Sequence, residues 1–327
     1  MSDLQNKILE ILSDQQFHSG ESLGEQLGVS RTAVWKQLQK LEAIGFQLES
    51  VKGVGYRAPA NFELLNIDSI NDQIAASGGC VPSRIEILKT IDSTNKYLRE
   101  RADSNAYSRA VVLAETQTSG RGRRGKDWIS PFAANLYMSV LWDFEHGAAA
   151  LEGLSLGVGV AVRRALMQCG LNEVQLKWPN DIYIKQKKLG GILLEMVGDP
   201  AGQCAVVIGI GINVSMPAKV AQAIDQDWTD IQTELDVPVS RNELAASLID
   251  EVFIILNDFQ TQGFAPYREE WQSADAFRGM QATVTTPREA LTGIVIGVDN
   301  SGALEMEMSD GKVRRFIGGE LSLRLKK

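Results

Sequence analysis

The N-terminal part of the chain changes from helical to strand periodicity within a short distance, and this change most constrains how the chain can fold. Apolar residues recur at helical spacing over Leu4–Leu12, and a second short helix is predicted over Glu21–Leu27. Gly28 can adopt the left-handed conformation that ends a helix, and Ser30 is a good N-cap for a third helix at about Arg31–Ile44. The order of these elements predicts a small helical unit that folds on its own.

Two short strands follow the third predicted helix. Phe46–Val51 and Val54–Arg57 alternate in polarity around Lys52-Gly53, which indicates a hairpin or wing. Residues 31–57 carry five Lys/Arg against two acids, a net charge of +3, in a protein whose overall charge is −8. A local basic surface on an acidic protein favours selective DNA contact.

We therefore predict a winged helix-turn-helix whose third helix lies in a major groove. The alternative is a three-helix domain with a purely structural role, whose basic third helix faces solvent and does not bind DNA. The side chains expected to contact DNA are Arg31, Thr32, Lys36, Gln39 and Lys52.

The length of 327 residues predicts two or three domains. Ala58–Asn61 breaks the pattern and is the expected linker, and we place the domains at 1–60, 64–272 and 273–327. No apolar run reaches the roughly 18 residues that span a bilayer, and the N-terminus does not resemble a signal peptide, so we expect a cytoplasmic location and no membrane partner. Three scattered cysteines and two histidines argue against a disulfide framework, a zinc site and histidine-based chemistry.

The segment Glu115–Trp128 is the most unusual part of the chain. Three Arg, one Lys and three Gly lie within Gly120–Lys126. Glycines allow the backbone to approach a ligand, successive N–H groups can form an anion-binding nest, and arginines are fork-shaped donors for carboxylate or phosphate. The spacing also fits G-x-G-x-x-G, but Pro131 stops the helix that a dinucleotide-binding motif requires. The loop is therefore predicted to hold an anion.

An apolar helix at Leu151–Gly170 precedes three strand-like runs, Val174–Ile184, Lys188–Val197 and Ala205–Val214. Their alternation predicts antiparallel strands covered on one face by that helix. The runs also contain Lys177, the turn 178–181, Lys188 and Asn213, which a plain core strand does not need. For any one of them a turn-forming role is an open alternative.

The last part of the chain contains a long predicted helix, Asn242–Gln262, followed by five short strands over 281–325. Turn sequences at 299–302 and 309–312 separate the strands. A small β-barrel of SH3-like type is the natural interpretation. Gly318-Gly319-Glu320 is either a strand joint or a contribution to substrate binding.

Five motifs in one order resemble the bacterial biotin–protein ligases. They are SerThrAsn at 93–95, GRGRRG at 120–125, KWPND at 177–181, KLGGIL at 188–193 and GIGIN at 209–213. Because the helix-turn-helix precedes them, the chain specifically resembles the bifunctional ligases that also repress biotin genes. The resemblance implies an α+β protein with an N-terminal winged helix-turn-helix, a central mixed-sheet catalytic domain like that of class II synthetases, and a C-terminal SH3-like barrel.

The resemblance also implies roles for individual residues. Arg123 and Lys188 would be catalytic. The biotin site would consist of Ser93, Thr94, Asn95, Gln117, Arg121, Gly122, Arg123 and Lys188. The ATP and Mg²⁺ site would consist of Lys177, Asn180, Asp181, Asn213 and Trp228. Asp127 stands where the family often has a basic residue, and Gly190 where Ala is common.

The implied activity is ATP-dependent formation of biotinyl-5′-AMP and transfer of biotin to a lysine of the biotin carboxyl carrier protein of acetyl-CoA carboxylase. Mg²⁺ would accompany ATP near Asn180 and Asp181, and no tightly bound metal or prosthetic group is expected. The adenylate would act as corepressor, promoting a homodimer that binds the operator DNA of biotin synthesis genes. The alternatives are a lipoate–protein ligase and a biotin-sensing DNA-binding regulator without ligase activity.

Overall fold

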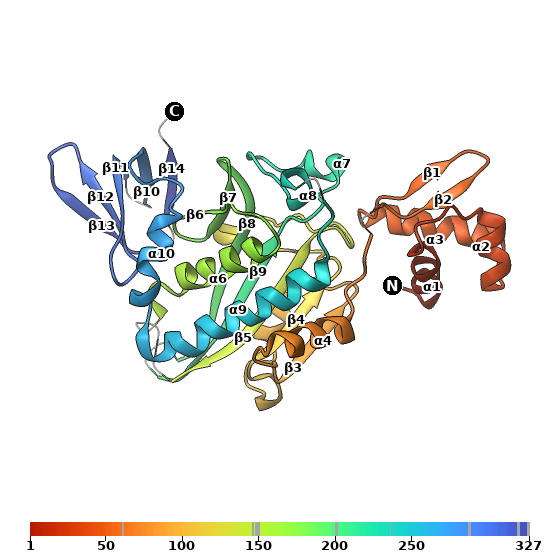
Figure 1. Cartoon of the computed structure of the whole chain (residues 1–327), viewed down its shortest axis with the longest axis horizontal. Helices are drawn as coiled ribbons and strands as arrows, with labels where there is room; N and C mark the ends of the chain where they lie inside the picture. The colour runs from red at the N-terminus through yellow and green to blue at the C-terminus, as the bar shows by residue number, and fades with distance from the viewer. Residues whose placement is uncertain are drawn as a thin grey trace.

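The computed structural model describes residues 1–60, 62–145, 147, 151–199, 202–235, 237–286, 289–318 and 321–325. Figure 1 shows a helical head at the N-terminal end, a large central sheet with helices, and a small C-terminal sheet at the opposite end. This confirms the predicted α+β class and its three parts. The last residue of the predicted linker, Asn61, and the motif residues Gly319 and Glu320 lie outside the described residues, so the linker and the exact domain limits stay predictions.

The head contains the predicted three helices and hairpin. These elements are α1 (Asp3–Leu12), α2 (Gly20–Leu27), α3 (Arg31–Ala43), β1 (Glu49–Val51) and β2 (Gly55–Arg57). Gly28 ends α2 with a φ of 66°, and the Ser30 side chain accepts a hydrogen bond from the Ala33 N–H to cap α3. Ile8, Leu12, Val34 and Leu38, among others, form the buried core of the head.

The head also packs against the body. Phe132, from the segment that follows the arginine-rich loop, belongs to the same buried cluster as Phe46 and Phe62. Its ring contacts Phe46 edge-on at 6.1 Å between centroids, and its N–H donates to the Ile44 carbonyl at 3.0 Å. The end of α3 is therefore in direct contact with the body.

The central sheet has seven strands in the order β3-β4-β5-β9-β8-β7-β6. Only β3 and β4 run parallel and all other neighbours are antiparallel, so the sheet is mixed, as predicted. The strands are β3 (Arg84–Leu88), β4 (Ala110–Ala114), β5 (Leu136–Phe144), β6 (Gln175–Lys177), β7 (Asp181–Ile184), β8 (Lys187–Gly198) and β9 (Cys204–Ile212).

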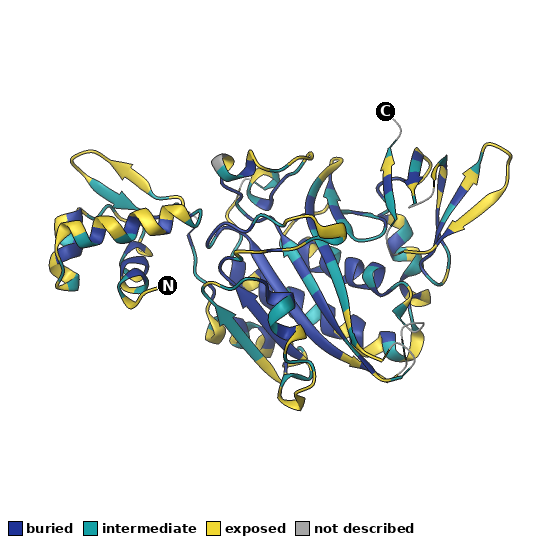
Figure 2. Ribbon diagram, turned by 180° about the vertical axis from the view of Figure 1, so that it is seen from behind, coloured by how far each residue is buried: buried dark blue, intermediate teal, exposed yellow. Residues whose placement is uncertain are grey.

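Helices cover both faces of this sheet. On one face α6 (Leu154–Gln168) and α9 (Arg241–Gln262) pack against each other and the strands, with α4 (Ile67–Ser77) beside α9. On the other face, the short helix α5 (Thr94–Arg99) lies over β4, β5 and β9. Strands β4 and β5 are almost completely buried, whereas β8 is mostly half-buried or exposed, and Figure 2 shows this mix of dark blue and teal in the sheet.

A buried polar cluster fixes the segment that leaves the head. Arg241, at the start of α9, forms an ion pair with Glu115 at 2.7 Å and donates to the Asn135 carbonyl at 3.1 Å. Glu63 accepts from the Arg241 N–H at 2.6 Å, and the Asn242 side chain bonds Leu64 and Asn66. We call Glu63, Glu115, Arg241 and Asn242 the linker clamp. It ties the chain after the head to α9 and to the end of β4.

The C-terminal part contains all five predicted strands in one antiparallel sheet, ordered β13-β12-β11-β10-β14. They are β10 (Gln281–Thr285), β11 (Ala290–Val298), β12 (Leu304–Met308), β13 (Val313–Phe316) and β14 (Ser322–Leu325). Short helices α7 (Ala218–Ala221), α8 (Ile231–Glu234) and α10 (Arg268–Ser273) connect the larger elements. Among the described residues, none of the helices has the length and apolar character to cross a membrane.

Candidate active site and DNA-binding face

Glycines form the floor of the main cavity on the central sheet. In β9, Gly209 and Gly211 pair with Ser139 and Tyr137 of β5 and with Leu193 and Gly191 of β8. A Cβ at Gly211 would come within 2.6 Å of the Trp128 ring, and one at Gly209 would collide with the Asn95 side chain. The GIGIN sequence therefore provides the space in which the Asn95 and Trp128 side chains approach the sheet closely.

The cavity above this floor has a volume of about 490 Å³. Seven Arg/Lys side chains but only two Asp side chains line it, which makes it suited to anions. The predicted residues that line it are Ser93, Thr94, Asn95, Gln117, Arg121, Gly122, Arg123, Lys177, Asn180, Asp181 and Lys188.

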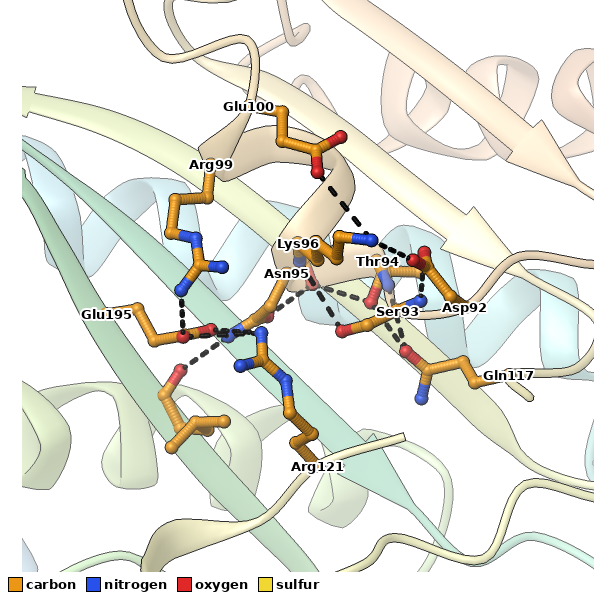
Figure 3. A network of polar contacts seen from close by, with 12 residues as sticks. Asp92, Ser93, Thr94, Asn95, Lys96, Arg99, Glu100, Gln117, Arg121 and Glu195 are labelled. Atoms are coloured by element: carbon orange, nitrogen blue, oxygen red, sulfur yellow. Dashed lines mark hydrogen bonds and ion pairs between the residues drawn. The ribbon is translucent and has the colours of Figure 1, made fainter. Parts of the chain in front are cut away.

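One wall of the cavity is a network of neutral polar groups at the start of α5 (Figure 3). Gln117 accepts from the Thr94 N–H at 2.9 Å, and the Ser139 hydroxyl lies 2.7 Å from Thr94 Oγ1 and 2.6 Å from Asn95 Oδ1. Ser93 caps α5 through a bond from the Lys96 N–H. Polar groups that are held in place in this way fix the orientation of a bound ligand by hydrogen bonds of defined direction.

The arginine-rich loop forms the opposite rim. The Gly122 N–H donates to the Lys126 carbonyl at 2.7 Å, and Arg124 and Gly125 turn the chain with φ of 58° and 70°. The Arg123 guanidinium donates to Asn180 at 2.9 Å and to the Leu321 carbonyl of the C-terminal segment at 3.3 Å. Burial lowers the pKa of Arg123, so this cation lies in a partly dehydrated place where an anion would interact with it strongly.

Three charged side chains meet at the inner end of the cavity. Asp181 bonds Lys188 at 2.6 Å and Lys177 at 3.4 Å, and Lys177 also donates to the Tyr183 hydroxyl at 3.0 Å. Burial acts to raise the pKa of Asp181, but the ammonium groups of Lys188 and Lys177 outweigh it and hold that pKa below its usual value. Asp181 is therefore a carboxylate at neutral pH and orients both lysines.

A second cavity of about 490 Å³ lies on the other side of Lys188 and Trp128. It contains the remaining two predicted residues, Asn213 and Trp228. The Asn213 amide donates to the Thr229 carbonyl at 3.0 Å, and the backbone on either side of Trp228 bonds that of Lys188. Both cavities share Lys126, Asp127, Trp128 and Lys188, so a ligand in each would meet at this junction.

The predicted DNA-binding residues lie on one helix and the hairpin. Thr32, Lys36 and Gln39 are exposed on α3, opposite the buried Val34, Leu38 and Leu41. Arg31 is exposed at the first position of the helix, and Lys52 is exposed at the hairpin turn. Gln39 donates to Glu42 at 2.7 Å, so one acid lies close to this face. Trp35 is half exposed on the same side of the helix.

Sequence reasoning gave no role to three residues that shape the main cavity. Trp128 lines both cavities, and its indole N–H has no hydrogen-bond partner among the described residues. Ser139 and Glu195 bond the residues at the start of α5. Trp128 directly follows the arginine-rich loop, which was a usable indication, whereas Ser139 and Glu195 look like ordinary strand residues.

Comparison with known proteins agrees with this geometry. Residues 87–213 match the Biotin/lipoate A/B protein ligase family, residues 4–57 match an HTH domain and residues 279–324 match the Biotin protein ligase C terminal domain. The chain is 41% identical to the Bifunctional ligase/repressor BirA of Escherichia coli (strain K12), over 97% of this chain and 96% of that protein. It is 29% identical to the protein of the same name from Bacillus subtilis (strain 168), over 98% and 99% of the two chains.

Among solved structures, the chain resembles the biotin protein ligase from Aquifex aeolicus in complex with biotin and ATP. The TM-score is 0.64 and the identity 27%, over 74% of this chain and 99% of that one. The fold, the cavity and the relatives thus agree along nearly the whole sequence. The chain belongs to the family of bifunctional biotin–protein ligase/repressors.

Proposed function

We propose that the protein activates biotin with ATP and transfers it to a lysine of a biotin carboxyl carrier protein. The observation that carries this proposal is the junction of the two cavities, where Lys188 and the arginine-rich loop surround one point. Biotin would occupy the cavity lined by Thr94, Asn95 and Gln117, and the nucleotide would occupy the cavity that contains Trp228. The two reacting groups are both anions, and the cations lie where those anions would approach.

The chemistry explains the choice of residues. A carboxylate resists attack by an amine because it is anionic and has a poor leaving group. Attack of the biotin carboxylate oxygen on the α-phosphorus of ATP forms the mixed anhydride and releases pyrophosphate. The lysine amine then attacks the acyl carbon, AMP leaves with the bonding electron pair, and the amine loses a proton. Arg121, Arg123 and Lys188 would lower the barrier of the first step by offsetting the combined negative charge.

Two carboxylates lie near this junction: Asp127, which lines both cavities, and Asp181. Asp181 is close, but its depressed pKa makes it a poor proton acceptor. We therefore propose that Asp181 orients Lys177 and Lys188, and that the proton of the amine is lost to solvent.

Mg²⁺ would enter with ATP. No group of three His, Cys, Asp or Glu side chains that could hold a metal occurs among the described residues. Asp181 and Asn180 supply oxygen atoms next to the cavity, which suits a cation that is bound mainly by phosphate oxygens and water. When bound, the cation would reduce the charge of the triphosphate.

We further propose that the adenylate-bound protein forms a homodimer that represses biotin synthesis genes in the cytoplasm. The exposed polar side chains of α3 have donors for a major groove, and a two-fold dimer would match a palindromic operator. Mobility-shift measurements test the role of α3: Lys36→Ala and Gln39→Ala should weaken operator binding without changing ligation. Unchanged operator binding by both variants would remove the recognition role from this helix.

The direct test of the ligase activity measures pyrophosphate release from Mg-ATP with biotin or lipoate in parallel, with detection of the acyl-adenylate by mass. Biotin-dependent release is expected. Lipoate dependence would indicate a lipoate–protein ligase, and no release with either acid would leave a DNA-binding sensor. Arg123→Gly should release the adenylate into solution, where it would label the lysines of bystander proteins. Retention equal to that of the wild type would contradict the role of Arg123.

A further inference from the structure

Glu195 is a carboxylate on the cavity side of β8 that the proposed reaction does not use. Gly191 and Leu193, which precede it on the same face of the strand, both line the main cavity. The Glu195 side chain is only 18% exposed. It lies between Asn95 at the start of α5 and Arg121 of the arginine-rich loop, and Figure 3 shows the side chains of Asn95, Arg99 and Arg121 converging on it.

On the α5 side, Glu195 fixes the orientation of Asn95. The Asn95 Nδ2 donates to Glu195 Oε2 at 2.8 Å and to the Leu193 carbonyl at 3.3 Å. A carboxylate only accepts hydrogen bonds, so it pairs with the NH₂ end of the amide and turns Oδ1 towards the Ser139 hydroxyl, 2.6 Å away. The close approach of Gly209 beneath Asn95 leaves the side chain little room to move elsewhere.

On the loop side, the same carboxylate holds two arginines. Arg121 Nη2 lies 3.3 Å from Glu195 Oε1, and Arg99 Nη1 lies 3.1 Å from the same oxygen. Arg121 belongs to the arginine-rich loop and lines the main cavity. Arg99 is at the end of α5 and is not among the residues that line the cavity. The two arginines therefore share one partner but differ in their access to a ligand.

We infer that Glu195 is a positioning residue that connects the ring-binding end of the biotin pocket to the arginine-rich loop. This inference rests on the proposed function. Through Asn95, Glu195 sets which end of an amide faces a bound biotin. Through Arg121, it holds the rim of the loop beside the same pocket. Without its charge the Asn95 amide loses its orienting acceptor, and the loop loses an anchor to the sheet.

The test uses Glu195→Gln and Arg99→Ala in the full-length protein. Calorimetry with biotin gives the Kd, and steady-state pyrophosphate release in the presence of the carrier protein, which removes the adenylate, gives KM and kcat separately. We expect Glu195→Gln to raise the Kd and the KM for biotin about 10-fold or more, because charge-assisted hydrogen bonds are lost. The kcat at saturating biotin should change less than about 3-fold, since no reacting atom is touched. Arg99→Ala should leave the Kd within about 2-fold.

A double-mutant cycle separates positioning from general loss of stability. If Glu195 acts partly through Arg121, Glu195→Gln should weaken biotin binding less in an Arg121→Ala background than in the wild type. Glu195→Asp keeps the charge but shortens the reach, so it provides a second variant should Glu195→Gln fold poorly, and it should also raise the KM. If the wild type binds biotin and both Glu195 variants bind it with an unchanged Kd, this inference alone is overturned. No biotin binding by the wild type would overturn the proposed function itself.

Discussion

The linker clamp and the arginine-rich loop both concentrate charge, but they use it in opposite ways. In the clamp, the side chains of Arg241 and Glu115 are 4% and 2% exposed and bond each other and nearby backbone groups. In the loop, Arg124 and Lys126 are exposed and make no ion pair among the described residues. A charge buried with its partner maintains structure, whereas a charge held at the rim of a cavity remains available to a ligand.

This difference leads to a general expectation for the molecule. Changes in the clamp should alter the free energy of unfolding and leave the chemistry of the remaining folded protein intact. Changes at the junction of the two cavities should slow the chemistry and leave the free energy of unfolding nearly unchanged.

Arg241→Met should produce the largest effect. It leaves Glu115 buried without its cation, which typically costs about 3–5 kcal/mol of folding free energy. Urea unfolding of the catalytic domain, followed by tryptophan fluorescence, measures the loss. At a temperature where the variant is folded, its KM for biotin should be close to that of the wild type. A loss below about 1 kcal/mol would show that the clamp is not a structural element of this kind.

Lys188→Ala should slow adenylate formation about 100- to 1000-fold, as loss of a group that stabilises developing charge typically does. The unfolding free energy should change by only about 1 kcal/mol, because Lys177 still accompanies Asp181. Single-turnover formation of biotinyl-AMP measures the rate. Lys187→Ala, one residue earlier and exposed, is the matched control and should behave like the wild type. A rate within 10-fold of the wild type would exclude Lys188 from the chemical step.

Asp275 is intermediate between the buried, paired charges of the linker clamp and the exposed charges of the arginine-rich loop. One of its buried carboxylate oxygens has no hydrogen-bond partner among the described residues. Burial raises its pKa to about 6. The folded state therefore binds the proton more tightly than the unfolded state, and stability falls as the pH rises from about 4 to 6. Asp275→Asn should remove this cost. After an allowance for partial exposure, we expect the variant to gain about 1–2 kcal/mol of folding free energy at pH 8. Unfolding at pH 8 and pH 4 checks the sign, because little gain is expected at pH 4.

Ser30→Ala tests a polar group that is satisfied but lies at the surface. Its hydroxyl caps α3, and loss of such a cap typically costs about 1 kcal/mol. The Tm of the head should fall modestly, and operator binding should become modestly weaker. Ser50→Ala, at an exposed strand position, is the control and should have no effect. Equal behaviour of the two variants would contradict the capping role.

Much of the fold could be predicted from the sequence, but not the first three strands of the sheet. The head, α6, α9 and the five C-terminal strands have clear periodicity or turn residues at their ends. In contrast, β4 is buried on both faces and forms a short apolar run without alternation in the sequence. The sequence therefore predicts no element for β4, nor for β3 and β5. Helix α4 begins at Ile67, because Asn66 caps it and the backbone before it bonds the linker clamp.

The sequence by itself determined which residues line the main cavity: motif order and residue types pointed to the loop, the lysines and the polar residues at the start of α5. Only the tertiary structure decided which distant side chains support them. Glu195 bonds Asn95 across 100 positions, and Arg241 bonds Glu115 across 126. Neither pair lies within one motif, and the packing of α5 and α9 against the sheet places them together. Motifs identify what touches a ligand because chemistry restricts the residue type. Supporting contacts depend on the distance between atoms, and only the folded chain sets that distance.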